Sequence, residues 1–255
     1  MKEIMSNKNE FIKKLKKLQR KKHREENGQY LVEGFHLIEE AAKSLVDIQW
    51  VIVDQRGLKE WKQWLEEQDQ TKMIFVSDEV MKSLSDLPAP QGIIGVLAIP
   101  KEIETLEQSG NWLALDNVQD PGNVGTMVRT ADAAGYAGVI IGEGSADIYS
   151  TKVLRAMQGS HFHLPIVRGE ISHYLQQFKA AGLPVYGTEL NEQAIDYSIL
   201  EPSESSLLIM GNEGQGVAKE LLMETTQNVY IPIKGQAESL NVAVAAGILM
   251  YQLSI

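Results

Sequence analysis

The residues best suited to chemistry lie in three short loops of the second half of the chain, rich in Gly, Asn and carboxylate side chains. The loops span residues 116–125, 210–216 and 231–241. Each follows an apolar run of the length of a buried β-strand. Because ligands bind at the carboxyl ends of the strands in open α/β sheets, we predict that the loops share one binding edge. Tight turns and helix caps are the alternative explanation, since Asn, Asp and Gly serve both purposes.

The third loop leads into an almost wholly apolar segment, residues 242–251, with Ser239 at the position expected for a helix N-cap. This segment is too short to cross a bilayer, which takes about 20 residues, so it is predicted to be a helix buried in protein. A buried helix start presents free N–H groups and the positive end of the helix dipole, which suits a polar or anionic ligand. A well-capped core helix without a ligand is the alternative.

Several common chemistries lack their residues here. The sequence has no Gly-Lys-Ser/Thr element, and Gly142-Glu143-Gly144 lacks the third glycine of a dinucleotide-binding loop. His161 and His163 flank Phe162 without a carboxylate or cysteine cluster that would complete a metal site. Ser239 is not in a Gly-x-Ser-x-Gly context. These patterns argue against a nucleotide-dependent oxidoreductase, a metal enzyme and a serine hydrolase.

Apolar runs and helical patterns alternate along the chain, which predicts an α/β fold with two domains. A basic amphipathic helix is expected over residues 11–24, and the polar stretch 101–110 reads as a linker between domains 1–100 and 111–255. The continuous apolar strands of the second domain are typical of a parallel sheet covered on both faces. We expect strands at residues 30–32, 50–53, 73–76 and 93–99, then at 112–115, 138–141, 164–167, 184–186, 207–210 and 229–233.

Charge is distributed unevenly along the 255 residues. Residues 1–30 hold ten Lys or Arg against four carboxylates, although the whole chain has a formal net charge of −10. A local excess of cations indicates contact with a polyanion such as RNA or DNA, whatever the global sum. A solvated helix face or a floppy tail is the alternative. The chain has no Cys, no membrane-length apolar run and a charged N-terminus without a secretory signal pattern, so we expect a cytoplasmic protein.

Together the three loops resemble the motifs of the SpoU-type RNA 2′-O-ribose methyltransferases of the SPOUT superfamily. Residues 120–131, 209–217 and 231–245 are similar to the first, second and third motif, in the right order. The one small departure is Ile233, where Met is frequent. The resemblance covers residues 112–255, and residues 13–100 also resemble the ribosomal-protein-like substrate-binding domain of the ribosomal RNA branch.

The resemblance implies a SPOUT α/β domain whose C-terminal portion forms a trefoil knot, and a homodimer with its active sites near the interface. It also implies S-adenosylmethionine as the cofactor, without a metal. The cofactor-binding positions carry over to Gly187, Thr188, Gly211, Ile231, Ile233, Ser239 and Leu240.

The family's functional residues match Asn123, Arg129, Glu213, Ser239 and Asn241. A guanidinium is effectively always protonated, which makes Arg129 a poor formal base. Our hypothesis is that Arg129 binds the target phosphate and stabilises the developing alkoxide. The two asparagines and Ser239 would orient the ribose and Arg129, while Glu213 would hold the loops or pair with Arg129.

The sequence therefore predicts an S-adenosylmethionine-dependent RNA 2′-O-methyltransferase. Ribosomal RNA is favoured over transfer RNA because of the added N-terminal domain and its basic helix, which suit phosphate and shape contacts with folded RNA. A non-catalytic RNA-binding or ribosome assembly factor on the same fold is the alternative. The predicted RNA contacts are Lys13, Lys14, Lys17, Arg20 and Arg24.

Overall fold

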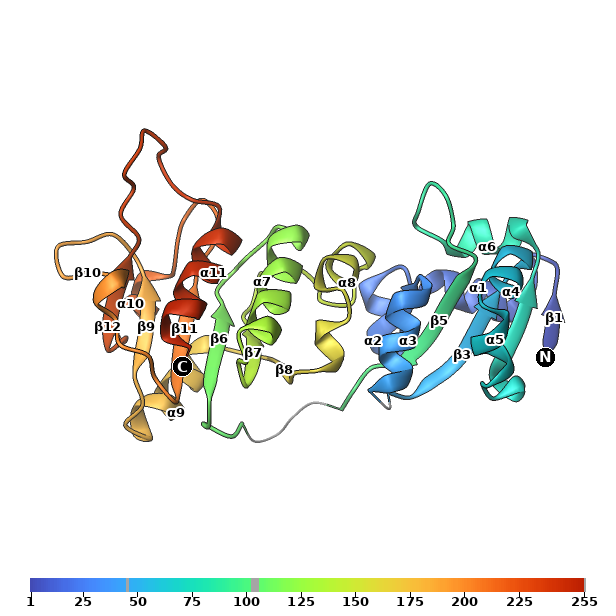
Figure 1. Ribbon diagram of the computed structural model, residues 1–255, viewed down its shortest axis with the longest axis horizontal. Coiled ribbons are helices and arrows are strands. Elements are labelled where there is room, and N and C mark those ends of the chain that lie inside the picture. Colours follow the sequence, from blue (N-terminus) through green and yellow to red (C-terminus); the bar gives the residue numbers. More distant parts are fainter. Residues whose placement is uncertain (45, 102–105, 255) are drawn as a thin grey trace. The chain divides into compact units, whose positions relative to one another are not determined.

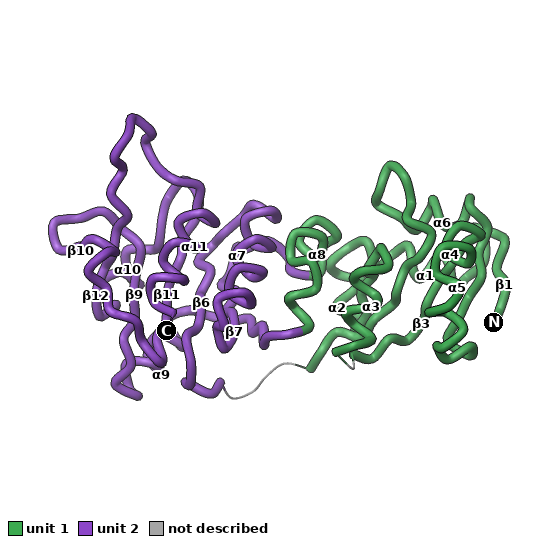
Figure 2. Tube along the Cα trace, viewed as in Figure 1, with its two compact units in different colours: residues 1–101, 149–162 green, residues 102–148, 163–255 purple. Residues whose placement is uncertain are grey.

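The computed structural model describes residues 1–44, 46–101 and 106–254 of the chain (Figure 1). The chain forms two compact units (Figure 2): unit 1 comprises Met1–Lys101 and Tyr149–Phe162, and unit 2 comprises Glu102–Ile148 and His163–Ile255. The sequence analysis assigned residues 149–162 to the second domain, but they pack within unit 1. Part of the predicted linker, residues 102–105, lies outside the described residues.

Unit 1 is built on a mixed five-stranded sheet in the order β1-β4-β3-β5-β2. Its strands are β1 (Lys2–Ile4), β2 (Gln29–Glu33), β3 (Ile48–Val53), β4 (Met73–Val76) and β5 (Ile93–Ala98). The first three strands of the sheet are parallel, and β5 is antiparallel to both of its neighbours. Strand β1 was missed in the sequence because three residues are too few to show a period.

The helices of unit 1 cover both faces of this sheet. They are α1 (Glu10–Lys17), α2 (Lys21–Asn27), α3 (Phe35–Lys43), α4 (Gln55–Glu60), α5 (Lys62–Glu66), α6 (Asp78–Leu84) and α8 (Thr151–Met157), with 3₁₀ turns η1 (Gln70–Lys72) and η2 (Ser160–Phe162). Ile12 of α1 and Met81 of α6 belong to the same core cluster as Ile52 and Ile74 of the sheet. Ile38 of α3 packs beside Gly95. With helices on both faces of the sheet, unit 1 is a three-layer α/β unit, which agrees with the predicted α/β class.

The single helix predicted over residues 11–24 is wrong, because the chain breaks it into α1 and α2. The stripe Ile12, Leu15 and Leu18 is buried as expected. In an unbroken helix the carbonyl of Leu18 would accept a hydrogen bond from the N–H four residues later. Here it accepts one from the Arg24 guanidinium instead, with Nη1 and O 2.7 Å apart. A buried arginine therefore satisfies the carbonyl that the break leaves open.

Unit 2 holds a seven-stranded sheet in the order β10-β12-β9-β11-β6-β7-β8, in which every pair is parallel. The strands are β6 (Asn111–Leu115), β7 (Gly138–Ile141), β8 (Ile166–Arg168), β9 (Val185–Thr188), β10 (Ile195–Asp196), β11 (Ser206–Met210) and β12 (Gln227–Tyr230). The parallel sheet predicted from the continuous apolar runs is confirmed. Strand β12 ends earlier than predicted, since Pro232 has no N–H to continue a ladder.

The helices of unit 2 are α7 (Pro121–Ala133), α9 (Ile171–Ala180), α10 (Lys219–Leu222) and α11 (Val242–Leu253), with the turn η3 (Tyr197–Ile199). Leu175 and Phe178 of α9 share one core cluster with Leu207 and Ile209 of β11. Helix α11 packs along α7 and also contacts β11. Among the described residues, no helix is long and apolar enough to span a membrane.

Two expectations for the last helix are wrong. Its N-cap is Asn241, whose side chain accepts from the N–H groups of Ala243 and Val244. Ser239 lies two residues before this N-cap, so it does not cap the helix. The helix is also not wholly covered within one chain, because Val244 is 53% exposed and Tyr251 60% exposed.

Candidate active site

The carboxyl ends of β6 and β11 hold the first two loops together. The N–H of Asp116 donates to the Met210 carbonyl, with N and O 2.8 Å apart, and the Asp116 carboxylate accepts from the N–H of Ala218 at 2.7 Å. The side chain of Asn212 donates to the carbonyl of Asn117 at 2.8 Å. Asx residues placed directly after strands thus join the loops. The sequence analysis did not identify the side chains of Asp116 and Asn212 as organisers of the site, although their position after apolar runs was visible.

Two backbone features shape these loops. Asn117 has φ of 54°, in the left-handed region that asparagine tolerates better than most residues. In the second loop, the N–H groups of Asn212 and Gly216 each donate to the other's carbonyl with N and O 2.9 Å apart, which closes a tight turn. A Cβ at Gly211 would lie 2.1 Å from the carbonyl carbon of Gly216. Only glycine therefore fits at Gly211.

Three of the predicted catalytic side chains form a continuous hydrogen-bonded chain across the three loops. Nδ2 of Asn241 donates to Oδ1 of Asn123 at 2.9 Å, and Nδ2 of Asn123 donates to Oε1 of Glu213 at 3.1 Å. The Oδ1 of Asn241 accepts from two N–H groups of α11. In both asparagines Nδ2 donates and Oδ1 accepts. The start of α11 therefore fixes the direction of the hydrogen bonds from Asn241 through Asn123 to Glu213.

Glu213 joins the second loop to the first. Besides Asn123, its carboxylate accepts from the N–H groups of Asp120 and Gln119, with N and O 3.0 and 3.2 Å apart. Partial burial acts to raise the pKa of Glu213, but these hydrogen bonds outweigh it and hold that pKa below its usual value. Of the two roles expected for Glu213, the geometry supports the one that holds the loops.

Arg129 and Ser239 are not part of this hydrogen-bonded chain. Both are exposed, and among residues 1–44, 46–101 and 106–254 neither has a hydrogen-bond or ion-pair partner. Asn123 and Arg129 both lie on α7. At about 3.6 residues per turn, the spacing between them is not a whole number of turns, so the two side chains point in different directions. The guanidinium is available to a ligand from outside this unit.

A cavity of about 610 Å³ opens beside Glu213. Pockets for ligands of cofactor size run from about 300 to 1,000 Å³. Its walls come from the end of β9, the tight turn of the second loop, the third loop and the first turns of α11, and six of the predicted cofactor residues line it: Thr188, Gly211, Ile231, Ile233, Ser239 and Leu240.

Gly187 does not line this cavity. It is buried in β9, where a Cβ would lie 2.6 Å from Oδ1 of Asn228 and 2.7 Å from a methyl of Leu222. A residue without a Cβ is required at this position for packing inside the unit, not for the wall of the cavity. Two carboxylates that the sequence analysis did not select, Glu189 and Glu238, do line the cavity. Each is the sequence neighbour of a predicted cofactor residue, Thr188 or Ser239, and this adjacency is the signal that could have identified them.

The predicted RNA contacts in unit 1 divide into two groups. Lys13, Lys14, Lys17 and Arg20 are exposed on α1 and the turn after it. Arg24 is only 5% exposed. The prediction that Arg24 contacts RNA is wrong, because its side chain holds the break between α1 and α2 from the inside.

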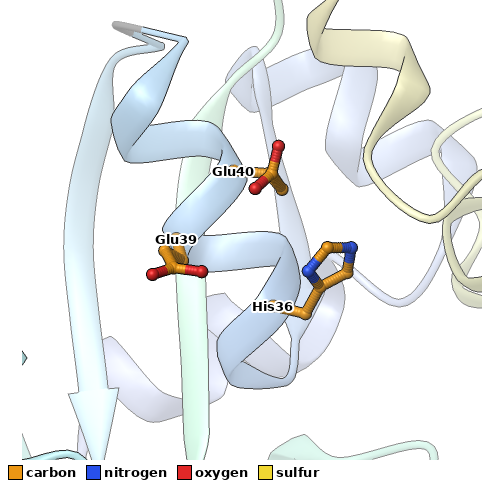
Figure 3. Close-up of side chains that lie close together, drawn as sticks. All are labelled: His36, Glu39 and Glu40. Carbon is orange, nitrogen blue, oxygen red and sulfur yellow. The ribbon is translucent and has the colours of Figure 1, made fainter.

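A second cluster of potential ligand atoms lies on α3, where His36, Glu39 and Glu40 project near one another (Figure 3). The ammonium of Lys43 lies 3.1 Å from an oxygen of Glu39 and 3.1 Å from an oxygen of Glu40. A cation bound here would have to displace that lysine, so we assign no metal to this cluster.

Comparison with known proteins identifies the arrangement. The profile of the SpoU rRNA Methylase family matches residues 111–251, and that of the MRM3-like substrate binding domain matches residues 9–95. The chain belongs to the SpoU rRNA methylase family. The resemblance predicted from the three motifs is thereby confirmed, as is that of the N-terminal region.

Relatives of this SpoU family member cover most or nearly all of the chain. A 23S rRNA (guanosine(2553)-2′-O)-methyltransferase of Bacillus subtilis is 44% identical over 254 residues, covering 99% of each chain. A 23S rRNA (uridine(2479)-2′-O)-methyltransferase of Streptomyces viridochromogenes is 30% identical, covering 88% of this chain and 82% of the relative. A solved AdoMet-bound rRNA methyltransferase from Sinorhizobium meliloti is 30% identical with a TM-score of 0.88, covering 99% of this chain and 97% of that one.

Proposed function

We propose that this protein transfers the methyl group of S-adenosylmethionine to a ribose 2′-hydroxyl of ribosomal RNA. The observation that carries the proposal is the cavity whose wall includes Glu213, because the same carboxylate holds Asn123 and, through it, Asn241. A cofactor-sized cavity and the matched functional residues of the family therefore meet at one carboxylate. The names of relatives that cover 99% and 88% of the chain support ribosomal RNA as the substrate.

The residues around the cavity fit the cofactor. Thr188, Gly211, Ile231 and Leu240 would hold it, largely through backbone groups and apolar contact, because the walls combine loop backbone with aliphatic side chains. When bound, S-adenosylmethionine supplies an electrophilic methyl group on a cationic sulfur.

The protein's own residues would then position the ribose. Arg129, which is exposed and without a partner among the described residues, would bind the RNA phosphate and stabilise negative charge on the 2′-oxygen as its proton leaves to phosphate or water. Asn123 and Asn241 are held in fixed amide orientations, so they and Ser239 would orient the ribose. Positioning is the largest contribution expected of such a site, since in-line methyl transfer needs little other assistance.

We propose that the protein acts as a homodimer. The stripe Val244, Ile248 and Tyr251 on α11 is apolar and has the spacing of one helix face, and its first and last residues are exposed. Helix α11 packs along α7, which carries Arg129, so a second copy covering this stripe would lie near the active site. Substitution of Val244 by Glu should yield monomers in multi-angle light scattering. The matched control is Met223→Glu, at an apolar residue 77% exposed directly after α10, which should leave the dimer intact.

Four further features complete the proposal. The exposed cations Lys13, Lys14, Lys17 and Arg20 would contact RNA phosphates, and the region 101–110 would link a substrate-binding domain to a catalytic domain. The parallel sheet and the order of the motif loops support the trefoil knot expected of the family. A ribosomal RNA substrate supports a cytoplasmic location.

The test is transfer of labelled methyl from S-adenosylmethionine to total RNA of a strain that lacks the gene, followed by mapping of ribose methylation. Wild type should modify one 2′-position of ribosomal RNA, and Arg129→Ala should lose this activity. Arg129→Lys keeps the charge but loses the planar guanidinium group. Wild-type activity in that variant at every pH would refute the proposed role of Arg129 in binding the phosphate and stabilising the 2′-oxygen.

Three other outcomes have defined meanings. Modification of transfer RNA alone would replace the proposed substrate. Cofactor binding without incorporation into any RNA would favour a non-catalytic RNA-binding or assembly factor. Failure to bind S-adenosylmethionine would refute the methyltransferase proposal.

A further inference from the structure

The cavity beside the second and third loops has an unusual charge composition. Three of the residues that line it carry carboxylate side chains: Glu189 after β9, Glu213 in the second loop and Glu238 in the third. Within residues 1–44, 46–101 and 106–254, no Lys, Arg or His lines this cavity. The other walls are mainly aliphatic side chains and loop backbone, including Leu190, Met210, Val229, Ile231 and Leu249.

Apolar walls make this charge imbalance effective. Unit charges interact more strongly where low-dielectric surroundings replace water, and a cleft lined by one sign of charge concentrates the field. Glu213 accepts three hydrogen bonds from N–H groups, which favour its ionised form. Glu189 accepts a hydrogen bond from the side chain of Asn191, which holds its carboxylate at the end of β9.

The ligand expected in this cavity changes its charge during the reaction. When the methyl group leaves for the ribose oxygen, the C–S bond electrons remain on sulfur, so a cationic sulfonium becomes a neutral thioether. The ribose hydroxyl loses its proton to phosphate or water, which balances the step. All other groups of the cofactor stay the same. A negative cavity therefore distinguishes the two forms by charge.

We infer that Glu189 and Glu238 determine the specificity of the cavity for the cationic sulfonium cofactor over its neutral thioether product. This inference rests on the proposed function. Glu213 is excluded from the assignment because it also holds the first loop and Asn123. The consequence is selective uptake of S-adenosylmethionine and weaker retention of S-adenosylhomocysteine after each turnover.

A different role for the same carboxylates would be hydrogen bonding to the ribose hydroxyls or the amino group of the cofactor. These groups are identical in both forms of the ligand. A carboxylate used in that way would change both affinities by the same factor, whereas a carboxylate that acts through charge changes their ratio. The ratio of the two dissociation constants is therefore the diagnostic quantity.

The experiment is calorimetric titration of the full-length protein with S-adenosylmethionine, S-adenosylhomocysteine and sinefungin, whose protonated amine replaces the sulfonium. Wild type, Glu189→Gln, Glu238→Gln and the double variant are compared. Glu192→Gln is the matched control, because Glu192 is exposed in the loop that follows Glu189 but does not line the cavity. Each preparation is first shown to melt as wild type does.

Each single substitution should reduce the preference for S-adenosylmethionine over S-adenosylhomocysteine about three- to tenfold, mainly by weakening the cationic ligand. Sinefungin should follow S-adenosylmethionine. The double variant should show the larger loss, Glu192→Gln none, and added salt should narrow the wild-type preference.

An unchanged ratio in the double variant, or a parallel loss of both ligands, would overturn the inference while leaving the proposed function standing. Equal affinities of the wild type for the cationic and neutral forms would overturn it as well. Binding of neither ligand by the wild type would overturn the proposed cofactor and this inference together.

Discussion

Asn241 uses the two ends of one amide for two different purposes. Its Oδ1 accepts from the N–H groups of Ala243 and Val244, with O and N 2.9 and 3.3 Å apart, and so caps α11. Its Nδ2 donates to Oδ1 of Asn123 at 2.9 Å and so orients the chain that ends at Glu213. A substitution that keeps one function and removes the other would separate stability from catalysis.

Asn241→Asp is that substitution. The introduced carboxylate can still accept from the helix N–H groups, and negative charge at a helix start stabilises by about 0.3–1 kcal/mol. The lost side-chain hydrogen bond costs about 1 kcal/mol, so the free energy of unfolding should change by less than about 1 kcal/mol. Asn241→Ala loses the cap as well, which costs a further 0.5–2 kcal/mol, typically about 1.

The effect of Asn241→Asp on catalysis should be much larger. An acceptor would face Oδ1 of Asn123, and a rotation of the Asn123 amide to restore that contact would turn its oxygen toward the Glu213 carboxylate. One link of the chain is broken in either case. Loss of positioning of this kind should lower the single-turnover methylation rate about 10- to 100-fold at saturating cofactor.

The assay pairs urea denaturation with single-turnover methylation of the mapped RNA. Asn9→Asp is the matched control, because the Asn9 side chain caps α1 by accepting from the N–H of Phe11, with O and N 2.9 Å apart, and lies in unit 1. That variant should keep both its stability and its rate. A wild-type methylation rate in Asn241→Asp would refute the reasoning about amide orientation.

Three further predictions concern other parts of the molecule. Gly211→Ala should weaken S-adenosylmethionine binding more than tenfold in calorimetry, because its Cβ would meet backbone, whereas Gly214→Ala should be tolerated, since its nearest neighbour lies 3.7 Å away. Burial raises the pKa of Glu33 despite hydrogen bonds from Ser85. Protonated Glu33 therefore contributes stability to the fold below a pH of about 4.3, and this contribution is lost as pH rises through the folded-state pKa. Glu33→Gln should therefore stabilise the protein against urea at pH 7 and lose that advantage near pH 4. Arg24→Leu should cost about 1–3 kcal/mol of stability without changing the salt slope of RNA binding, unlike neutralisation of the exposed lysines of α1.

Much of the catalytic half could be predicted from local patterns. Continuous apolar runs predict buried parallel strands because both faces of such strands are covered, and the seven-stranded parallel sheet agrees. Asn123, Glu213 and Asn241 could be selected because the three loops resemble the motifs of the SpoU family. Their hydrogen-bonded chain could not be foreseen, since it joins residues 90 and 118 positions apart in the sequence.

The errors share one physical cause, which is that contacts between distant segments override local preference. Ser239 has a suitable side chain for a cap, but the helix starts later, with Asn241 as its cap, because Asn241 also donates a hydrogen bond to the distant Asn123. The sequence pattern suggests that Arg24 is one more surface cation of a basic helix. Instead, its guanidinium is buried and donates a hydrogen bond to the Leu18 carbonyl between α1 and α2.

The amino-acid pattern alone was sufficient for the α/β class, the order of the motifs and the residue types of the site, because strand periodicity and loop chemistry are local properties. The assignment of residues 149–162 to unit 1, the burial of Arg24, the cavity and its three carboxylates required the folded chain. Those features depend on which remote surfaces meet, as when α8 packs against β2 and Thr151 donates to Asp86 at 2.5 Å. Packing free energy between such surfaces is set by shape and burial, which no single stretch of sequence contains.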